Sequence, residues 1–241
     1  MKVLLINGSP NEHGCTYTAL AEVADTLHKY DIATEIVYLG RKPIAGCIAC
    51  MKCFETGHCF RDDMVKELQK RLDEFDGIVL GSPVYYSNPT GQILSFVQRL
   101  FFCKEGVMAG KLGASVVSCR RGGASAAFES LNQFFTICNM PVVSSQYWNS
   151  VHGFTPEDVH KDKEGLQTMR SLGENMAWML KALAGNPHPA YEQRQELILS
   201  KINIDYEKWY FNTGSGFNDV VYSFFLRLKN KRECRFSCYA M

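Results

Sequence analysis

Four cysteines lie close together in the segment GCIACMKCFETGHCF, residues 46–60. They have the spacing C-x2-C-x2-C-x5-C and are Cys47, Cys50, Cys53 and Cys59. Three thiolates spaced C-x2-C-x2-C can reach three corners of one iron–sulfur cubane, and Gly57 lets the chain turn back so that a fourth can follow. Structural zinc sites more often pair two knuckles across a longer stretch. The spacing therefore favours a cluster over zinc, and thiols that stay reduced or cycle through a disulfide are the remaining alternative.

The composition is that of a globular protein without a strong charge. The chain has 241 residues, 46% of them hydrophobic and 21% charged, and a net charge of +1. This balance gives no electrostatic reason to expect nucleic acid or an acidic membrane as a partner. The apolar run at residues 3–6 is too short for a signal peptide, and no run approaches the ~18 residues of a membrane span. We expect a cytoplasmic protein, in which clustered cysteines bind metal or do redox chemistry rather than form structural disulfides.

Alternating strand and helix patterns surround the cysteine segment. Apolar runs predict strands over 3–7, 34–39, 77–84, 113–119 and 140–148. Amphipathic patterns predict helices over 16–30, 62–75, 89–102, 123–138 and 164–184, with Asp62 or Asp63 as an N-cap. The fold class is therefore α/β, a doubly wound sheet of five parallel strands.

The carboxyl ends of parallel strands carry the ligand site in such folds. The turns to examine are 8–15, 82–89 and 118–125, together with the long connection 40–61. Because the cysteine segment follows the second strand, we expect it to project from the same sheet edge as these turns. Trp148, which follows the fifth predicted strand, is expected to pack in the core.

The first turn, NGSPNEHGCT at residues 7–16, suits an anion. Gly8 and Gly14 allow the chain to turn, Ser9 and Thr16 offer hydroxyls, and a helix begins here with free backbone N–H groups. It has neither a G-x-G-x-x-G pattern nor a lysine for a nucleotide-binding P-loop. A terminal phosphate monoester fits these features, and an ordinary strand-to-helix turn of the same composition is the alternative.

The second and third turns suit a flat aromatic ring. Tyr85 and Tyr86 follow a buried strand directly, where stacking on a ring or packing on neighbouring loops are the two alternatives. Gly122 and Gly123 in the third turn allow close backbone approach. The neighbouring Arg120 or Arg121 is expected to reach the edge of such a ring or a phosphate, or to be solvated surface charge.

These turns resemble the NADPH-dependent FMN reductase family, which has a flavodoxin-like fold. GSPNEHGCT resembles that family's G-S-P-R-x-x-G-N-T loop, which wraps the FMN phosphate, with Asn11 in place of Arg and Cys15 in place of Asn. GSPVYYSNPTGQ resembles the S-P-V-Y-[FY] segment, which lies along the isoalloxazine ring. The resemblance covers roughly residues 1–185. The cysteine spacing is similar to that of the iron–sulfur flavoprotein subgroup, whose four cysteines ligate a [4Fe–4S] cluster that exchanges electrons with FMN.

The resemblance implies a set of site residues. The metal ligands would be Cys47, Cys50, Cys53 and Cys59. The FMN-binding residues would be Ser9, Asn11, Gly14, Cys15, Thr16, Pro83, Val84, Tyr85, Tyr86, Ser87, Arg120, Gly122 and Gly123. A flavin carries its own hydride chemistry, so no side chain is assigned a catalytic role.

The resemblance implies an FMN-dependent oxidoreductase that passes NAD(P)H electrons to flavin, quinone or a similar acceptor. The alternative is an iron–sulfur flavoprotein electron carrier that accepts electrons from ferredoxin, because a cluster beside a flavin can take single electrons. The acceptor is a small molecule or a protein in either case. No membrane or nucleic acid is expected as a partner.

The segment GNPHPA at 185–190 indicates a domain boundary, between an FMN-binding domain over 1–188 and a helical arm over 189–241. Helical patterns cover 191–203 and 217–230. The arm is expected to pack on a partner subunit, giving a homo-oligomer, or on its own domain; a membrane-surface helix is the least favoured alternative.

Overall fold

The computed structural model describes residues 1–102 and 104–186 of the chain. Its centre is one sheet of five parallel strands in the order β2-β1-β3-β4-β5. The strands are β1 (Lys2–Asn7), β2 (Ala33–Tyr38), β3 (Gly77–Pro83), β4 (Leu112–Cys119) and β5 (Ser150–His152). This order is that of flavodoxin-like doubly wound folds, and it confirms the predicted fold class.

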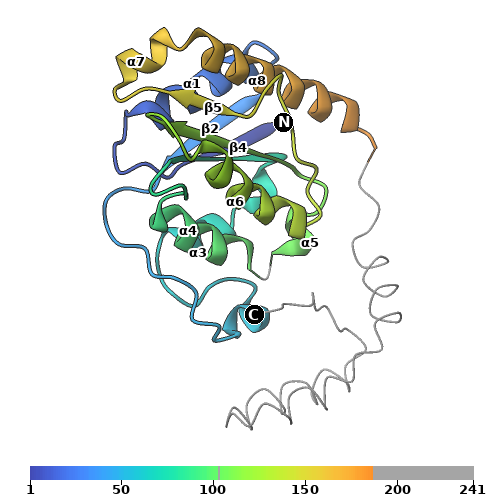
Figure 1. Ribbon diagram of the computed structural model, residues 1–241. Coiled ribbons are helices and arrows are strands. Elements are labelled where there is room, and N and C mark those ends of the chain that lie inside the picture. The colour runs from blue at the N-terminus through green and yellow to red at the C-terminus, as the bar shows by residue number, and fades with distance from the viewer. Residues whose placement is uncertain (103, 187–241) are drawn as a thin grey trace, which may run out of the picture. The chain divides into compact units, whose positions relative to one another are not determined.

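Helices cover both faces of the sheet (Figure 1). On one face α1 (Cys15–His28) and α8 (Lys163–Leu183) pack with α7 (Pro156–Lys161) over the apolar side chains of alternate strand positions. On the other face the core is formed with α3 (Met64–Gln69), α4 (Gly91–Phe101), α5 (Glu105–Met108) and α6 (Ala124–Ile137). The strands β1, β3 and β4 are buried on both faces, which explains their mostly apolar sequences.

Two of the predicted elements differ in the structure. The strand expected over 140–148 is wrong, because β5 comes later, at Ser150–His152, and Val142 forms only an isolated bridge to Gly113. Pro141 has no N–H to donate to a ladder, and Val143 is followed by the polar run Ser144, Ser145 and Gln146. Trp148 lies in this loop and is 54% exposed, so it is not a core residue.

The helix expected over 62–75 is shorter than predicted. The structure has α3 at Met64–Gln69, followed by a 3-10 turn, η1, at Leu72–Glu74. The predicted N-cap is confirmed, since the Asp63 side chain accepts a hydrogen bond from the Val65 N–H. The helical patterns at 191–203 and 217–230 lie outside the described residues.

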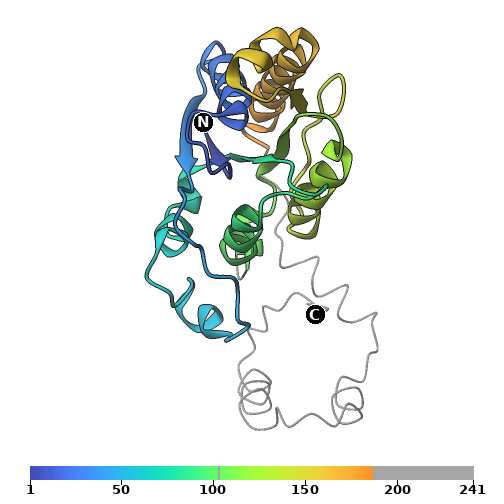
Figure 2. The same cartoon turned by 60° about the vertical axis from the view of Figure 1, so that its left-hand side comes forward.

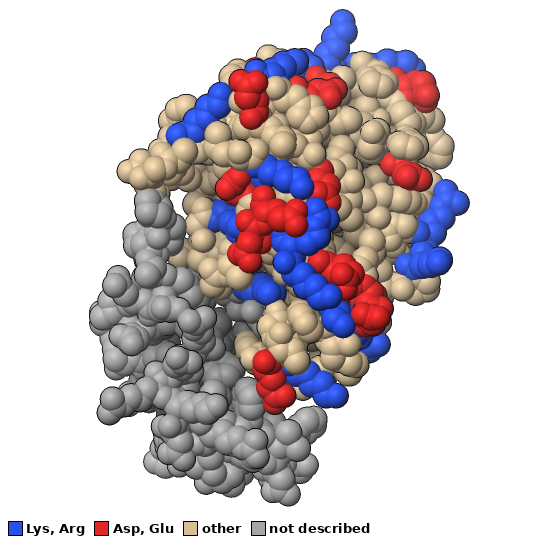
Figure 3. All heavy atoms as spheres, turned by 180° about the vertical axis from the view of Figure 1, so that it is seen from behind, with Lys and Arg blue, Asp and Glu red and all other residues tan. Residues whose placement is uncertain are grey.

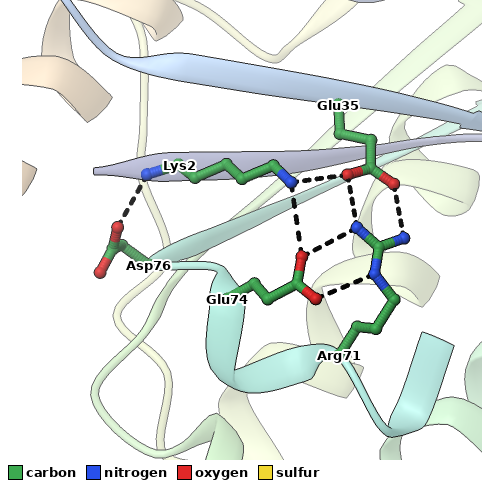
Figure 4. Close-up of polar contacts among 5 residues, drawn as sticks. All are labelled: Lys2, Glu35, Arg71, Glu74 and Asp76. Carbon is green, nitrogen blue, oxygen red and sulfur yellow. Dashed lines mark hydrogen bonds and ion pairs between the residues drawn. The ribbon is translucent and has the colours of Figure 1, made fainter.

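A network of charged side chains joins the amino-terminal end of the sheet to η1 (Figure 4). Glu35 of β2 accepts hydrogen bonds from Arg71 at 2.9 and 2.8 Å and from Lys2 at 2.7 Å. Arg71 also pairs with Glu74, and the Lys2 backbone N–H donates to Asp76. The Arg71 guanidinium, with help from Lys2, lowers the pKa of Glu35 from its usual 4.5 to about 2.

Glu35 should make the stability of the protein depend on pH in the acidic range. Its pKa is lower in the folded state, so its contribution is complete above pH 4.5 and is lost as the pH falls toward 2. Glu35→Gln should lower the free energy of unfolding at neutral pH by about 1 kcal/mol, since the pair is partly solvent-screened. Denaturant unfolding between pH 7 and 3 measures both effects. Glu129→Gln, on an exposed position of α6, is the matched control, and an equal loss in both variants would refute the role of the network.

Acidic and basic side chains are interspersed on the face shown in Figure 3, and neither sign forms a continuous field there. This agrees with the near-zero net charge. Within residues 1–102 and 104–186, the longest apolar helical stretch falls short of what a bilayer crossing requires.

Candidate functional site

Three turns at the carboxyl ends of β1, β3 and β4 are tied to one another. The Gly8 N–H donates to the Gly81 carbonyl at 2.8 Å and links the first turn to the second. The Val84 N–H donates to the Ser118 carbonyl at 2.9 Å and links the second to the third. The Thr16 and Ser118 hydroxyls lie 2.8 Å apart and link the first to the third. The structure therefore brings the three sequence-predicted turns into one site.

The first turn presents an uncapped helix end. Helix α1 has Gly14 as its N-cap, with no capping side chain and no acid in its first turn. Its first backbone N–H groups are therefore available to an anion. Ser9 is buried and its Oγ accepts a hydrogen bond from the Asn11 N–H at 3.1 Å, which leaves its own O–H to donate. Thr16 is 1% exposed and holds the turns together through Ser118.

Arg41 is a member of this site that the sequence did not single out. It follows β2, and its Nε donates to the Pro10 carbonyl at 2.8 Å while an Nη donates to the Asn11 Oδ1 at 3.3 Å. The Tyr38 hydroxyl donates to the same carbonyl at 2.8 Å. Arg41 thus places a positive charge beside the turn in which Asn11 stands where the family pattern has Arg.

The second turn is tight and strained. Tyr85 and Asn88 pair through two backbone hydrogen bonds of 2.8 and 2.9 Å. The two residues between them, Tyr86 and Ser87, have φ of 49° and 63°, the left-handed region that costs a non-glycine residue about 1–2 kcal/mol. Strain of this kind collects at functional sites. Tyr86 is fully exposed and Tyr85 is half exposed, and with Val84 they line an open hollow.

The third turn packs directly on the second. Gly123 has φ +87°, and a Cβ there would lie 2.8 Å from the Ser87 Oγ and 2.9 Å from its Cα. A Cβ on Gly122 would meet nothing within 4 Å. Gly123 therefore permits the close approach of the two turns, whereas Gly122 borders open space. Pro83 is the last residue of β3, and Arg120, which directly follows β4, is exposed.

The four cysteines gather around one pocket. Cys47, Cys50, Cys53 and Cys59 all line it, together with Phe60, Phe102 and Arg99. Cys47 and Cys50 are exposed thiols, Cys59 is half-buried and Cys53 is buried. The short helix α2 (Lys52–Thr56) lies inside the segment, and Gly57 ends it in the left-handed conformation. In the described part of the chain, no three His, Cys, Asp or Glu side chains are close enough together to hold a single metal ion.

From the sequence we expected the cysteine segment at the sheet edge where the three turns meet. The pocket lies elsewhere in the structure. The connection after β2 passes the start of α4, where Gln92 donates to the Leu39 and Gly40 carbonyls, and then continues along that helix. The cysteines lie against Arg99 and Phe102, at the far end of α4. Figures 1 and 2 show the connection that follows β2 running away from the sheet. An 11-residue helix is about 16 Å long, so the cysteine pocket and the three turns are separate sites in this chain.

Buried polar side chains hold the cysteine segment in place. Arg99 is 2% exposed, although it belongs to a helix whose inner face is otherwise apolar. It donates to both carboxylate oxygens of Asp63 at 2.7 and 2.8 Å. Burial opposes ionisation of Asp63, but Arg99 outweighs this and holds the pKa of that carboxyl below its usual value. The sequence did contain a signal for this role of Arg99. In the amphipathic pattern of residues 89–102, it is a charged residue at a position on the apolar face of the helix.

Two further cysteines lie near the turns. The Cys15 thiol points to the Gly153 carbonyl at 3.8 Å, and the Gly153 N–H donates to the Cys119 carbonyl. Burial raises the pKa of both thiols, so both are protonated at neutral pH. Neither has the lowered pKa of a nucleophilic cysteine.

A doubly wound sheet in the strand order β2-β1-β3-β4-β5, with an uncapped helix start and an open hollow at its carboxyl edge, defines a flavodoxin-like fold. Solved structures agree. RosB with its bound intermediate 8-demethyl-8-formylriboflavin-5'-phosphate has a TM-score of 0.66 at 14% identity, covering 83% of this chain and 87% of that one. A flavodoxin from the domain Archaea has a TM-score of 0.50 at 16% identity, covering 75% of this chain and 99% of that one.

The sequence comparisons give the family. Residues 1–155 match the NADPH-dependent FMN reductase family, and the chain belongs to it. An iron-sulfur flavoprotein of Methanocaldococcus jannaschii is 34% identical over 191 residues, which cover 76% of this chain and 99% of the relative. An iron-sulfur flavoprotein of Methanosarcina thermophila is 26% identical, covering 77% of this chain and 98% of the relative.

Proposed function

We propose that this chain is an FMN-dependent oxidoreductase that passes electrons from NAD(P)H to a flavin, a quinone or a similar acceptor. The observation that carries the proposal is the convergence of three turns on one site at the carboxyl edge of the sheet. Family membership supports both the flavin and the reaction class. FMN, when bound, supplies the hydride and single-electron chemistry, and the protein supplies position and polarity.

The residues of the turns fit FMN. The uncapped start of α1 and the Ser9 hydroxyl would hold the phosphate without a counter-cation in direct contact. The ring would lie in the hollow beside Val84, Tyr85 and Tyr86. A Cβ on Gly122 would meet nothing within 4 Å, so the third turn would leave room for a ring edge. Arg120 is exposed and would meet the ring edge or the phosphate of a nicotinamide.

Arg41 should contribute to FMN affinity through charge. It does not contact the α1 N–H groups but braces Pro10 and Asn11, so it orients the turn and adds attraction for a dianion. Arg41→Gln should weaken FMN binding about 3- to 10-fold, the range of an exposed charge interaction with a phosphate. The loss should shrink at high salt.

Fluorescence titration of the apoprotein with FMN measures this effect. Lys42→Gln, the adjacent exposed charge, is the matched control. Equal affinities for the wild-type protein and Arg41→Gln at low salt would contradict the role of Arg41.

We further propose that the four cysteines ligate one [4Fe–4S] cluster. Four thiols around one pocket supply the donor set, and a buried guanidinium beside them offsets thiolate charge. A zinc ion would need all four sulfurs about 2.3 Å from one point, and the described cysteines are not gathered so closely. A cluster is bulkier and suits sulfurs that ring a pocket. The relatives in Methanocaldococcus jannaschii and Methanosarcina thermophila are named iron-sulfur flavoproteins, which supports an iron–sulfur group in this chain.

A second candidate is an electron carrier that takes single electrons from ferredoxin and does not oxidise NAD(P)H. The exposed thiols Cys47 and Cys50 favour it, because a cluster at the surface is accessible to a protein donor. The reductase is our first proposal because the family match, over residues 1–155, includes all three turns proposed to bind FMN. The carrier proposal depends on the cysteine segment alone.

Parallel assays on anaerobically purified protein distinguish the two. Steady oxidation of NADH or NADPH with a quinone or free flavin would establish the reductase. Fast flavin reduction by reduced ferredoxin, with both nicotinamides inert, would establish the carrier and overturn the first proposal.

A further inference from the structure

Arg99 is the most deeply buried charge beside the cysteine pocket. Its side chain is 1% exposed. Besides the two bonds to Asp63, it donates through Nη1 to the Ala45 carbonyl at 3.1 Å. Its Nη2 and Nε lie 3.2 and 3.4 Å from the Cys59 sulfur. One guanidinium thus reaches the chain on both sides of the cysteine motif and one of its four sulfurs.

Cys59 is held from its backbone as well. Its N–H donates to the Gln69 Oε1 at 2.6 Å, and the Gln69 Nε2 donates to the Arg99 carbonyl at 2.6 Å. Gln69 is 2% exposed. Both the backbone and the sulfur of Cys59 are therefore held in place, by Gln69 and by Arg99 with its partner Asp63. Cys47 and Cys50, by comparison, are exposed at the surface.

We propose that Arg99 is a positioning residue that orients Cys59 for the cluster and raises the cluster's reduction potential through its N–H···S hydrogen bonds. This inference rests on the [4Fe–4S] cluster of the proposed function. One-electron reduction adds one negative charge to the cluster and its thiolates. A cation that donates to a ligand sulfur stabilises the reduced form more than the oxidised form. Because Arg99 is buried, solvent screens this effect little.

Asp63 limits how far Arg99 raises the reduction potential. Its carboxylate pairs with the same guanidinium and so opposes its positive field at Cys59. The two residues therefore act on the potential with opposite signs. The Arg99 guanidinium makes five contacts with Asp63, Ala45 and Cys59, and a lysine ammonium, with three donors, cannot replace them all.

The test is a redox titration of the cluster followed by electron paramagnetic resonance in full-length, anaerobically reconstituted protein. Arg99→Gln should shift the potential downward. At a fixed potential the ratio of reduced to oxidised cluster should fall about tenfold, which is about 59 mV for a one-electron couple. Asp63→Asn should shift the potential upward, since it removes the opposing charge and Asn still serves as an N-cap for α3. Damage to the fold alone would not produce shifts of opposite sign.

Loss of iron to a chelator is the second measurement. Arg99→Gln should release iron about tenfold faster than wild type, and Arg99→Lys should fall between them because it keeps the charge but not the fork. Arg170→Gln, on α8 and paired with Glu22, is the matched control and should match wild type in both measurements. Retained FMN in each variant reports that the fold is intact.

The outcomes separate the two proposals. Unchanged potential and iron release in both Arg99→Gln and Asp63→Asn, with a full cluster in wild type, would overturn the role of Arg99 and leave the proposed function standing. If Arg99→Gln fails to fold, Asp63→Asn decides, and the absence of an upward shift overturns the inference. Wild-type protein that takes up no iron or sulfide would overturn the cluster itself.

Discussion

Replacing Cys50 by Ala is expected to abolish the cluster and leave FMN bound. Cys50 is one of the four thiols around the pocket, and a cubane lacking one of four protein ligands is unstable. The turns proposed for FMN lie about one α4 length, or about 16 Å, away. After anaerobic reconstitution, wild type should contain about four irons and four sulfides per chain and the variant fewer than about one of each.

Cys138→Ala is the control for this experiment, because Cys138 is buried at the end of α6 and does not line the pocket. It should retain the wild-type iron content. If wild type and Cys50→Ala both take up no iron, the segment contains redox-active or idle thiols instead. One zinc per chain without sulfide would identify a single-metal site.

Gly123→Ala should impair FMN binding far more than Gly122→Ala. Alanine at φ +87° costs about 1–2 kcal/mol, and its Cβ would press on the Ser87 backbone. The turn that carries Tyr85 and Tyr86 would then move away from the ring. We expect FMN affinity to fall about tenfold or more, since tenfold corresponds to about 1.4 kcal/mol. Gly122 has open space around it, and its alanine variant should bind as wild type does.

Titration of the two apoproteins with FMN measures this difference, and thermal unfolding without FMN shows whether the fold itself has changed. Equal affinities in two folded variants would mean that the third turn does not shape the ring site.

The fold could be predicted because its strands are marked by local sequence. The runs at 3–7, 77–84 and 113–119 are almost continuously apolar through their cores, as strands covered on both faces should be, and the structure has β1, β3 and β4 there. The last strand was misplaced because β5 has only three residues, and the more apolar run before it makes a single bridge. Its position depends on pairing with β4, which no local pattern encodes.

The sequence located the segments of the candidate site, but not how far apart they lie in the fold. Loop patterns located the three turns and the four cysteines, because glycines, hydroxyls and thiols are informative by type and spacing. Arg41 and Gln69 gave no such signal, since their roles come from contacts with residues 30 and 10 positions away. The distance between the cysteine pocket and the turns also depends on the course of residues 40–61 along α4, which strand order alone does not fix.

The most direct test of the central claim is the flavin content of the purified protein. The account predicts a yellow protein that releases FMN, and not FAD, on denaturation, at about one per chain after reconstitution. Chromatography of the released flavin identifies it, and absorbance gives the stoichiometry. A well-folded protein that binds no FMN at high micromolar concentration would contradict the account, whatever its iron content.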